Sequence, residues 1–313
     1  MTLDLILFAI GLAGLYFGSE WLVEGAGRLA VSFGISSFVV GLTVVAFGTS
    51  APELVVSGLA SWRGNGALAI GNVVGSNIAN IALILGVAAW LQPIRVERSL
   101  IVRDVPIMIA FGLLFAVLGW NGTIAMWEAA LLLLLFVLYM GHVAMDARKN
   151  PEKLAPLDDL GLDRSRRGRD LLMTLGGIVV LAVAAQLLVS SATGIARTFG
   201  VSEVIIGLTL VAFGTSVPEL AASIAAAKRG EGQLVIGNIV GSNVFNISLI
   251  LGIAGLIRPL PVDAAVLTFD VPLMIALSLL LLPIVYTSRA VHRMEGVGLL
   301  AVYAAFLGWT ILM

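Results

Sequence analysis

Apolar residues occur in this chain in long stretches, separated by short segments rich in Gly, Pro and charged residues. A stretch of about 20 residues can cross a hydrocarbon layer of roughly 30 Å as a helix, which rises about 1.5 Å per residue. No stretch alternates apolar and polar residues as a membrane strand would. The pattern therefore predicts an all-α integral membrane protein. We expect ten transmembrane helices, near residues 4–27, 36–60, 67–91, 102–119, 124–146, 170–196, 203–227, 233–256, 264–286 and 294–312.

The two halves of the chain repeat each other. GLTVVAFGTSAPEL at residues 41–54 returns as GLTLVAFGTSVPEL at residues 207–220, with twelve of fourteen positions identical. GNVVGSNIANIALILG, which begins at Gly71, returns as GNIVGSNVFNISLILG from Gly237, at the same offset of 166 residues. The chain is therefore the product of a duplication.

Composition agrees with a membrane protein. Hydrophobic residues make up 59% of the chain and charged residues 12%, whereas about a quarter of the residues of an average soluble domain are charged. There is no cysteine, which excludes disulfides and thiolate metal sites. The first stretch lacks the positively charged amino-terminal region of a signal peptide, so we expect it to be a mature helix.

The basic residues indicate how the helices are oriented. If the amino terminus is outside, fifteen Lys and Arg residues face the inside and three, Arg63, Arg197 and Arg258, face the outside. Cytoplasmic loops carry the excess of positive charge, so we expect both termini outside. The polar segment 148–169 is then a cytoplasmic linker. Its acidic residues could bind a regulatory ion, but their setting is typical of a solvated linker.

The linker separates two units, residues 1–147 and residues 170–313. Each unit holds five predicted helices, an odd number, so the second must enter the membrane in the opposite orientation. Inverted repeats with broken helices that meet near the bilayer midplane are typical of secondary transporters.

The repeated AFGTS(A/V)PEL motif predicts such a broken helix. Pro52 lacks an amide hydrogen and its ring clashes with the carbonyl of Gly48, so the helix should bend there and the carbonyls of residues 46–49 should lose partners. Glu53 follows one turn after the break, and its copy Glu219 occupies the same position in the second half. A carboxylate inside a membrane helix costs about 2.5 to 3.5 kcal/mol and is a functional candidate by default. We expect the two carboxylates to share one cation site.

The neighbouring polar residues add oxygen donors. Asn72, Ser76 and Asn80 lie four residues apart on one helical face, and Gly71 and Gly75 allow another helix to approach closely. Carboxylate, hydroxyl, amide and carbonyl oxygens without Cys or His suit Ca²⁺ and Na⁺ better than transition metals. Each Ser or Asn taken singly could instead only link helices by hydrogen bonds.

Other charged residues favour structural roles. Glu20, Glu24 and Arg28 share one face of the first helix, where pairing four residues apart satisfies Glu24. Asp104 and Asp270 occur where helices begin, so we expect them to cap amide groups.

The doubled pair of motifs, AFGTSAPEL with GNVVGSNIANI and AFGTSVPEL with GNIVGSNVFNI, closely resembles the repeats of the cation/calcium exchanger superfamily, in its sodium/calcium exchanger branch. The resemblance covers nearly the whole chain. It implies that the second and third helices of each half form a central ion-binding core, along which the first and sixth helices slide.

The resemblance also implies a set of ligands. Ca²⁺ would be held by Glu53 and Glu219 with backbone oxygens of Thr49 and Thr215. Na⁺ would share the carboxylates. Asn80 and Asn246 would complete the middle of the site, with Ser50 and Ser216 as supporting polar groups. The remaining ligands of Na⁺ would be Ala46, Thr49 and Ser76 in one half and Ala212, Thr215 and Ser242 in the other. Some relatives, including those of the potassium-dependent branch, carry Asp where this chain has Asn246. A K⁺ requirement is therefore not expected here.

The function that follows is antiport of Na⁺ and Ca²⁺ in a cell membrane, with the lipid bilayer as surroundings. No cofactor, nucleic acid or obligate protein partner is expected. A proton/calcium exchanger is an alternative, because burial favours protonated carboxylates. A passive cation channel would also use a pair of acids, although inverted repeats favour a carrier. An enzyme is disfavoured because there is no GxSG or GxGD motif and neither His lies near an acid or a Ser in a core helix.

Overall fold

The structure is a computed structural model that describes residues 2–96, 100–149, 167–199 and 214–312. Within these residues, seven helices are long and apolar enough to cross a membrane, and a bent pair brings the number to eight. The predicted all-α membrane fold is confirmed. The count of ten spans stays a prediction, since residues 200–213, which precede α12 (Val217–Lys228), lie outside the described residues.

The first half contains a long helix, a broken helix and three further spans. In chain order its elements are α1 (Thr2–Phe33), α2 (Ser37–Val40), η1 (Gly41–Val45), α3 (Ala46–Thr49), α4 (Ala51–Trp62), α5 (Gly66–Ala79), η2 (Asn80–Leu85), α6 (Gly86–Leu91), β1 (Ile94–Arg95), η3 (Leu100–Asp104), α7 (Val105–Leu118), η4 (Gly119–Asn121), β2 (Thr123–Ile124) and α8 (Met126–Lys149).

The described part of the second half follows the same order. Its elements are α9 (Arg167–Thr198), α12, α13 (Gly232–Val244), η7 (Phe245–Ile250), α14 (Leu251–Ile257), β3 (Leu260–Pro261), η8 (Val266–Asp270), α15 (Val271–Ser288), β4 (Ala290–Val291) and α16 (Arg293–Leu312). The helices η2 and η7 are π-helical turns at equivalent positions in the two halves, and such turns are frequent at functional sites.

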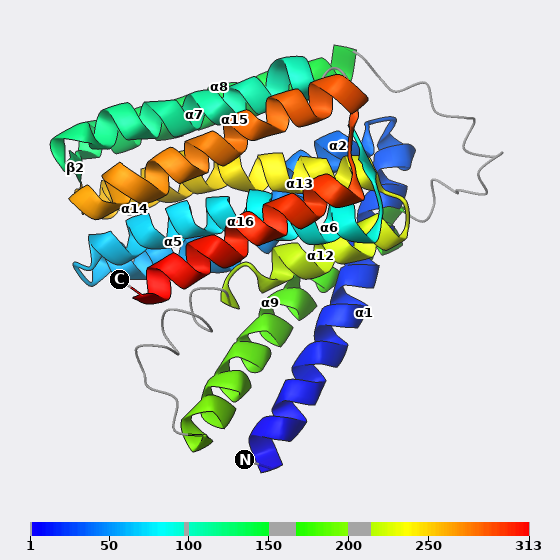
Figure 1. Cartoon of the computed structure of the whole chain (residues 1–313). Coiled ribbons are helices and arrows are strands. Elements are labelled where there is room, and N and C mark those ends of the chain that lie inside the picture. Colours follow the sequence, from blue (N-terminus) through cyan, green and yellow to red (C-terminus); the bar gives the residue numbers. More distant parts are fainter. Residues whose placement is uncertain (1, 97–99, 150–166, 200–213, 313) are drawn as a thin grey trace.

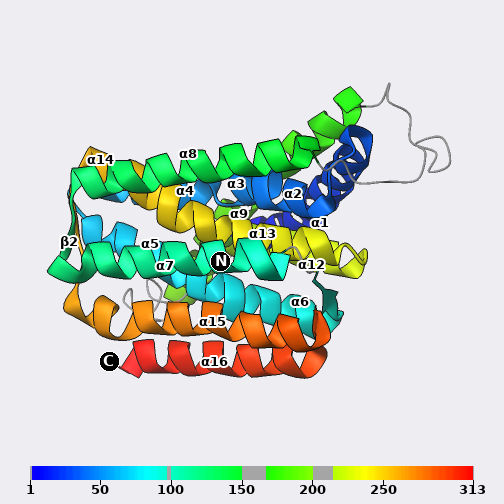
Figure 2. The same ribbon diagram turned by 90° about the horizontal axis from the view of Figure 1, so that it is seen from above.

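Two short strand pairs show that the halves are inverted. β1 pairs with β4 and β2 pairs with β3, both antiparallel. In the repeat, β3 is the copy of β1 and β4 is the copy of β2. Because α7 runs from β1 to β2, the two pairs lie at opposite ends of the helices, as Figures 1 and 2 show. Each strand therefore pairs with a strand of the other half. β1 and its copy β3 lie at opposite ends of the helices, and so do β2 and its copy β4. These strands were not predicted from the sequence.

The helices α1 and α9 form a pair that projects away from the other helices (Figure 1). Gly11, Gly18 and Gly25, spaced seven residues apart on α1, bring the two backbones together. A Cβ atom added to Gly11 would lie 3.0 Å from the amide nitrogen of Leu188, and one added to Gly25 would lie 2.7 Å from the carbonyl oxygen of Asp170. On α9, a Cβ on Gly177 would lie 2.6 Å from the amide nitrogen of Leu22. Contact of small residues over this length makes α1 and α9 one packed unit.

The prediction that Asp104 caps a helix is wrong. Its side chain makes no capping bond, because the backbone continues in helical form from η3 into α7. The carboxylate, fully buried, instead accepts hydrogen bonds from Tyr139 at 3.0 Å and from Nη2 of Arg103 at 3.1 Å. Asp270 likewise lies within the continuous helical run from η8 into α15.

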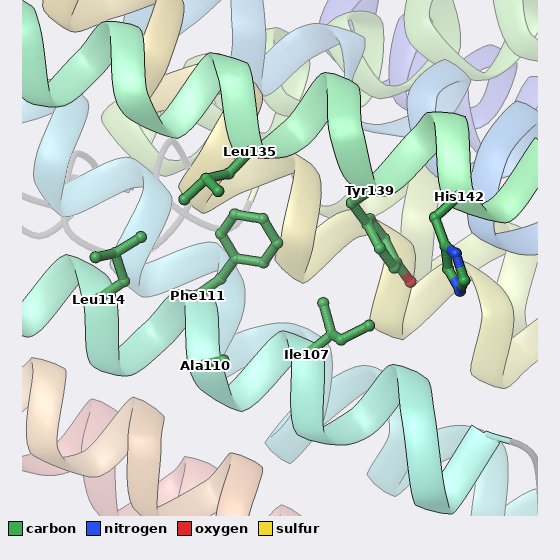
Figure 3. Close-up of a pocket in the computed structure, with 7 residues that line it drawn as sticks. All are labelled: Ile107, Ala110, Phe111, Leu114, Leu135, Tyr139 and His142. Atoms are coloured by element: carbon green, nitrogen blue, oxygen red, sulfur yellow. The ribbon is translucent and has the colours of Figure 1, made fainter.

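The side chain of Tyr139 also lines a pocket of about 320 Å³ between α7 and α8 (Figure 3). The other lining residues are Ile107, Ala110, Phe111, Leu114, Leu135 and His142. The lining is almost entirely apolar, and it shares no residue with the predicted cation site.

Candidate ion-binding site

The two candidate carboxylates lie at equivalent positions in the two halves. The helical segments 37–49 and 51–62 meet at an angle of 47°, at the break that Pro52 predicted. Glu53 lies in the first turn of α4 and Glu219 in the first turn of α12, each directly after a proline. Both are buried, with 1% and 2% of the residue exposed. The amide end of a helix favours a negative charge, which makes these turns suitable places for buried carboxylates.

Each carboxylate is bonded to a serine from the other half. Ser50 Oγ donates to Oε1 of Glu219 at 2.9 Å, and Ser216 Oγ donates to Oε1 of Glu53 at 3.2 Å. The same serines also contact the predicted hydroxyl ligands, Ser50 with Ser242 at 3.1 Å and Ser216 with Ser76 at 3.3 Å. Each half therefore supplies a hydrogen-bond donor to the carboxylate of the other half.

The second oxygens of the carboxylates are available. Oε2 of Glu53 and Oε2 of Glu219 are buried and have no hydrogen-bond partner among the described residues, and the same holds for Oδ1 of Asn246. A buried acceptor without a partner costs on the order of 1 to 3 kcal/mol, and more when it is charged. Three such oxygens in one region are the arrangement that a bound cation would stabilise.

The donor set around the carboxylates is neutral. Among the described residues, no group of three or more His, Cys, Asp or Glu side chains could hold a metal ion, and neither carboxylate forms an ion pair with Lys or Arg within that part of the chain. The two acids are thus complemented only by hydroxyl, amide and backbone oxygens. Hard cations such as Na⁺ and Ca²⁺ prefer oxygen donors of this kind.

The threonines use their hydroxyl groups for packing. Thr49 Oγ1 donates to the carbonyl oxygen of Val45 at 3.0 Å and contacts Oδ1 of Asn238 at 3.3 Å, while Thr215 Oγ1 contacts Oδ1 of Asn72 at 3.3 Å. Asn72 and Asn238 in turn donate to Ser57 at 3.0 Å and to Ser223 at 3.2 Å, respectively. Both threonine hydroxyls thus donate hydrogen bonds to other protein groups, and the backbone oxygens of Thr49 and Thr215 remain the predicted ligands.

One expectation about free carbonyls is wrong. The carbonyl oxygen of Ala46 accepts a bond from the amide of Ser50 at 3.0 Å, so it keeps its helical partner despite the break. The break begins only after Thr49, at Ser50. Ala46 itself is fully buried on the predicted face. Ala212, its counterpart, lies outside the described residues.

The close helix contact predicted at the repeated glycines is present in the second half. A Cβ atom on Gly237 would lie 2.4 Å from the carbonyl oxygen of Phe38, and one on Gly241 would lie 2.5 Å from that of Leu42. Glycine is therefore required here to let α13 cross the broken helix of the first half. The segment that would face Gly71 and Gly75 in the same way lies outside the described residues.

The predicted amide ligands are hydrogen-bonded to two further asparagines, Asn77 and Asn243, which the spacing of polar residues in the sequence did not indicate. Asn246 Nδ2 donates to Oδ1 of Asn77 at 2.9 Å, and Asn80 Nδ2 donates to Oδ1 of Asn243 at 3.3 Å. All of these side chains are buried. The signal that could have identified Asn77 and Asn243 is their repetition at the offset of 166 residues inside an apolar motif.

A cavity of about 540 Å³ lies beside the predicted site. It is lined by α4 and α9, including Ala51, Pro52, Gln186 and Arg197, and it reaches Thr215. Its counterpart between α1 and α12 has a volume of about 230 Å³, and its lining includes Glu20 and Lys228 but not Thr49, the copy of Thr215. The two cavities therefore differ in volume, and only the larger one reaches a predicted ligand.

Comparison with known proteins agrees with this geometry. The family model described as sodium/calcium exchanger protein matches the chain twice, at residues 3–145 and at residues 170–312. The chain belongs to this family. It is therefore a multi-pass membrane protein of a transporter family, one described by the exchange of Na⁺ and Ca²⁺.

Individual relatives of this exchanger-family chain match over its full length. The sodium/calcium exchanger MaX1 of Methanosarcina acetivorans is 37% identical, over 98% of each chain. The inner membrane protein YrbG of Escherichia coli is 34% identical, over 99% of this chain and 98% of its own. A solved structure of the sodium-calcium exchanger NCX_Mj, soaked with 10 mM Na⁺ and no Ca²⁺, covers 98% of each chain with a TM-score of 0.87 and 35% identity.

Proposed function

We propose that this protein is a secondary active antiporter that moves Na⁺ inward and Ca²⁺ outward by alternating access. The observation that carries the proposal is the pair of buried carboxylates, Glu53 and Glu219, each bonded to a serine of the opposite half and each with one oxygen free of a partner among the described residues. Membership of the sodium/calcium exchanger family supports the identity of the two ions.

The ligands of Ca²⁺ in this proposal are the carboxylates of Glu53 and Glu219 and the backbone oxygens of Thr49 and Thr215. Na⁺ uses the same carboxylates with Thr49 and Thr215, the Ser76 and Ser242 hydroxyls and the Ala46 and Ala212 backbone oxygens, of which Ala46 would use its second lone pair. The amide oxygens of Asn80 and Asn246 complete the middle of the site for either ion. Ser50 and Ser216 hold the carboxylates in place. Because both ions need Glu53 and Glu219, they cannot be bound fully at the same time, and this competition couples their movements.

The charge of the site makes the exchange electrogenic. Two carboxylates balance one Ca²⁺, whereas three Na⁺ would leave one positive charge. Both amide ligands, Asn80 and Asn246, are neutral and add nothing to this balance. Moving one net charge couples the exchange to the membrane potential by about 2.3 kcal/mol per 100 mV.

In this proposal, the packed pair α1 and α9 is the part of the protein that moves during alternating access. Since these helices contact each other along their length through Gly11, Gly25 and Gly177, they can move against the core as one body. The cavity beneath α9 carries Arg197, which the distribution of basic residues places outside. With both termini outside and the linker in the cytoplasm, the site in this conformation is approached from the outside of the cell membrane.

Calcium uptake into sodium-loaded proteoliposomes tests the proposal. Vesicles holding the purified protein and Na⁺ are diluted into Na⁺-free buffer with ⁴⁵Ca²⁺. Uptake should require the outward Na⁺ gradient, and a potential positive inside should accelerate it because the net charge leaves the vesicle. Calcium flux that ignores the Na⁺ gradient would contradict the proposal. Uptake that a protonophore collapses would indicate proton exchange, and conductance steps in planar bilayers would indicate a channel.

A further inference from the structure

A second layer of amides lies behind the predicted ligands. Asn77 and Asn243 occupy equivalent positions in α5 and α13, and only 1% and 2% of these residues are exposed. Neither belongs to the ligand set of the proposed function. A buried primary amide inside a membrane protein must find partners for two N–H groups and one oxygen, so its contacts show what it does.

Each of these amides receives a bond from a ligand of the other half. Oδ1 of Asn77 accepts from Nδ2 of Asn246 at 2.9 Å, and Oδ1 of Asn243 accepts from Nδ2 of Asn80 at 3.3 Å. A side-chain amide has its oxygen and nitrogen on opposite edges. When the nitrogen of Asn246 is held by Asn77, its oxygen must face the other way, and that oxygen is buried without a partner among the described residues.

The orientation of the second layer is fixed in turn by groups that can only accept hydrogen bonds. Nδ2 of Asn77 donates to Sδ of Met274 at 3.5 Å and to the backbone oxygen of Asn243 at 3.4 Å. Nδ2 of Asn243 donates to Sδ of Met108 at 3.4 Å. A thioether and a carbonyl have no proton to give. If the side-chain amide of Asn77 or Asn243 were rotated by 180°, its oxygen would face the methionine sulfur, which is also an acceptor. Its N–H group would then face the N–H group of Asn246 or Asn80.

We propose that Asn77 and Asn243 are positioning residues that keep the amide oxygens of Asn80 and Asn246 turned toward the transported ions and their N–H groups turned away. This inference rests on the proposed function, because it assumes that Asn80 and Asn246 are ligands. The methionines, on α7 and α15, anchor the second layer from outside the broken core helices. An N–H group turned toward a cation would repel it and remove a ligand, so the orientation affects binding directly.

A double substitution separates positioning from packing. Asn77→Leu keeps the volume and removes the acceptor, and it should raise the KM for Ca²⁺ on the order of tenfold with a smaller change in kcat. In a chain that carries Asn246→Asp, a carboxylate presents oxygen in either orientation. Adding Asn77→Leu there should change the KM by less than about twofold, since the coupling between the two sites is removed. The mirror pair is Asn243→Leu with Asn80→Asp.

The measurements are ⁴⁵Ca²⁺ uptake at varied Ca²⁺ and thermal unfolding of each purified variant. An equal rise of KM in both backgrounds would overturn the inference, because a packing defect does not depend on residue 246. If Asn77→Leu fails to fold, Met274→Leu carries the test: it keeps the volume, removes the sulfur acceptor, and should raise KM only when residue 246 is Asn. Glu53→Gln run in parallel separates the two proposals, since exchange that survives it refutes the proposed function, whatever Asn77 does.

Discussion

Ser50 donates a hydrogen bond of 2.9 Å to Glu219, 169 residues further along the chain, while its own neighbour in sequence, Glu53, is bonded to Ser216. The inverted repeat thus makes each half complete the carboxylate of the other. Neither half holds its carboxylate by its own serine, and a site of this kind exists only when both halves are assembled.

Removing either serine hydroxyl should weaken Ca²⁺ binding. Ser50→Ala leaves Oε1 of Glu219 without its donor, and Ser216→Ala does the same to Glu53. A hydrogen bond to a charged group is worth about 1.5 to 3 kcal/mol, so we expect the KM for Ca²⁺ to rise on the order of tenfold or more. Ser61→Ala is the matched control, because Ser61 is equally buried but donates to Ala254. Equal KM values for Ser50→Ala and Ser61→Ala would contradict the role of the crossed bonds.

α9 packs closely against Gly48 and Gly214, where a side chain would clash with it. A Cβ atom on Gly48 would lie 2.4 Å from Cδ1 of Ile178, and one on Gly214 would lie 2.4 Å from Cγ2 of Val189. Gly48→Ala should therefore impede the movement of α9 and lower the turnover rate several-fold, with less effect on KM. The double variant Gly48→Ala, Ile178→Ala should recover turnover. Failure of the second substitution to restore any activity would show that the contact does not limit movement.

Ion pairs at one end of the molecule tie α1 to the core. Arg229, which follows α12, bonds to Glu20 and lies 3.3 Å from Glu24, and Glu24 pairs with Arg28 at 2.6 Å. The copies of Glu20 and Glu24 in α9 are Gln186 and Ser190, so Arg63, the copy of Arg229, has no equivalent carboxylates there. This network should stabilise the conformation that is closed on the inside.

Arg229→Gln should shift the protein toward the inward-open conformation. Partly exposed ion pairs contribute up to about 1 kcal/mol each, so the expected change in population is several-fold. The chain has no cysteine, so Ser190→Cys in the cavity beneath α9 can report access by a membrane-impermeant thiol reagent. Labelling from outside should become slower in Arg229→Gln and stay unchanged in the matched variant Arg63→Gln. Equal labelling rates in both variants would argue against the ionic network.

The orientation of the chain can be tested with the same reagent. Cysteine at residue 312, at the end of α16, should react in intact cells if the carboxyl terminus is outside. Cysteine at residue 159 in the linker should react only after the membrane is made permeable. The reverse pattern would overturn the assignment that the basic residues indicate.

Much of the architecture was predictable because the chemistry is local. Pro52 and its missing amide predicted the break, and the cost of a buried carboxylate identified Glu53 and Glu219. The odd number of helices in each half predicted the inversion.

The cross-half contacts were not predictable in the same way. Ser50 is three residues from Glu53, and only the packing of the inverted halves gives it Glu219 as its partner. Asn77 lies off the stripe of residues four apart that drew attention to Asn80, so its bond to Asn246 could not be read from spacing. The helical run through η3 also removed the capping role expected for Asp104, because a helix that continues has no free amides to cap.

The central claim is that Glu53 and Glu219 form one shared site, and neutralising each in turn tests it most directly. Sodium-driven ⁴⁵Ca²⁺ uptake is measured for Glu53→Gln, Glu219→Gln and a control, Glu128→Gln, in which an equally buried Glu outside the site bonds to the amide of Ala125. Loss of one partner from a buried charged site costs about 3 to 5 kcal/mol, so each site variant should lose uptake by at least about a hundredfold while the control retains it. Full uptake in either Glu53→Gln or Glu219→Gln would contradict the shared site.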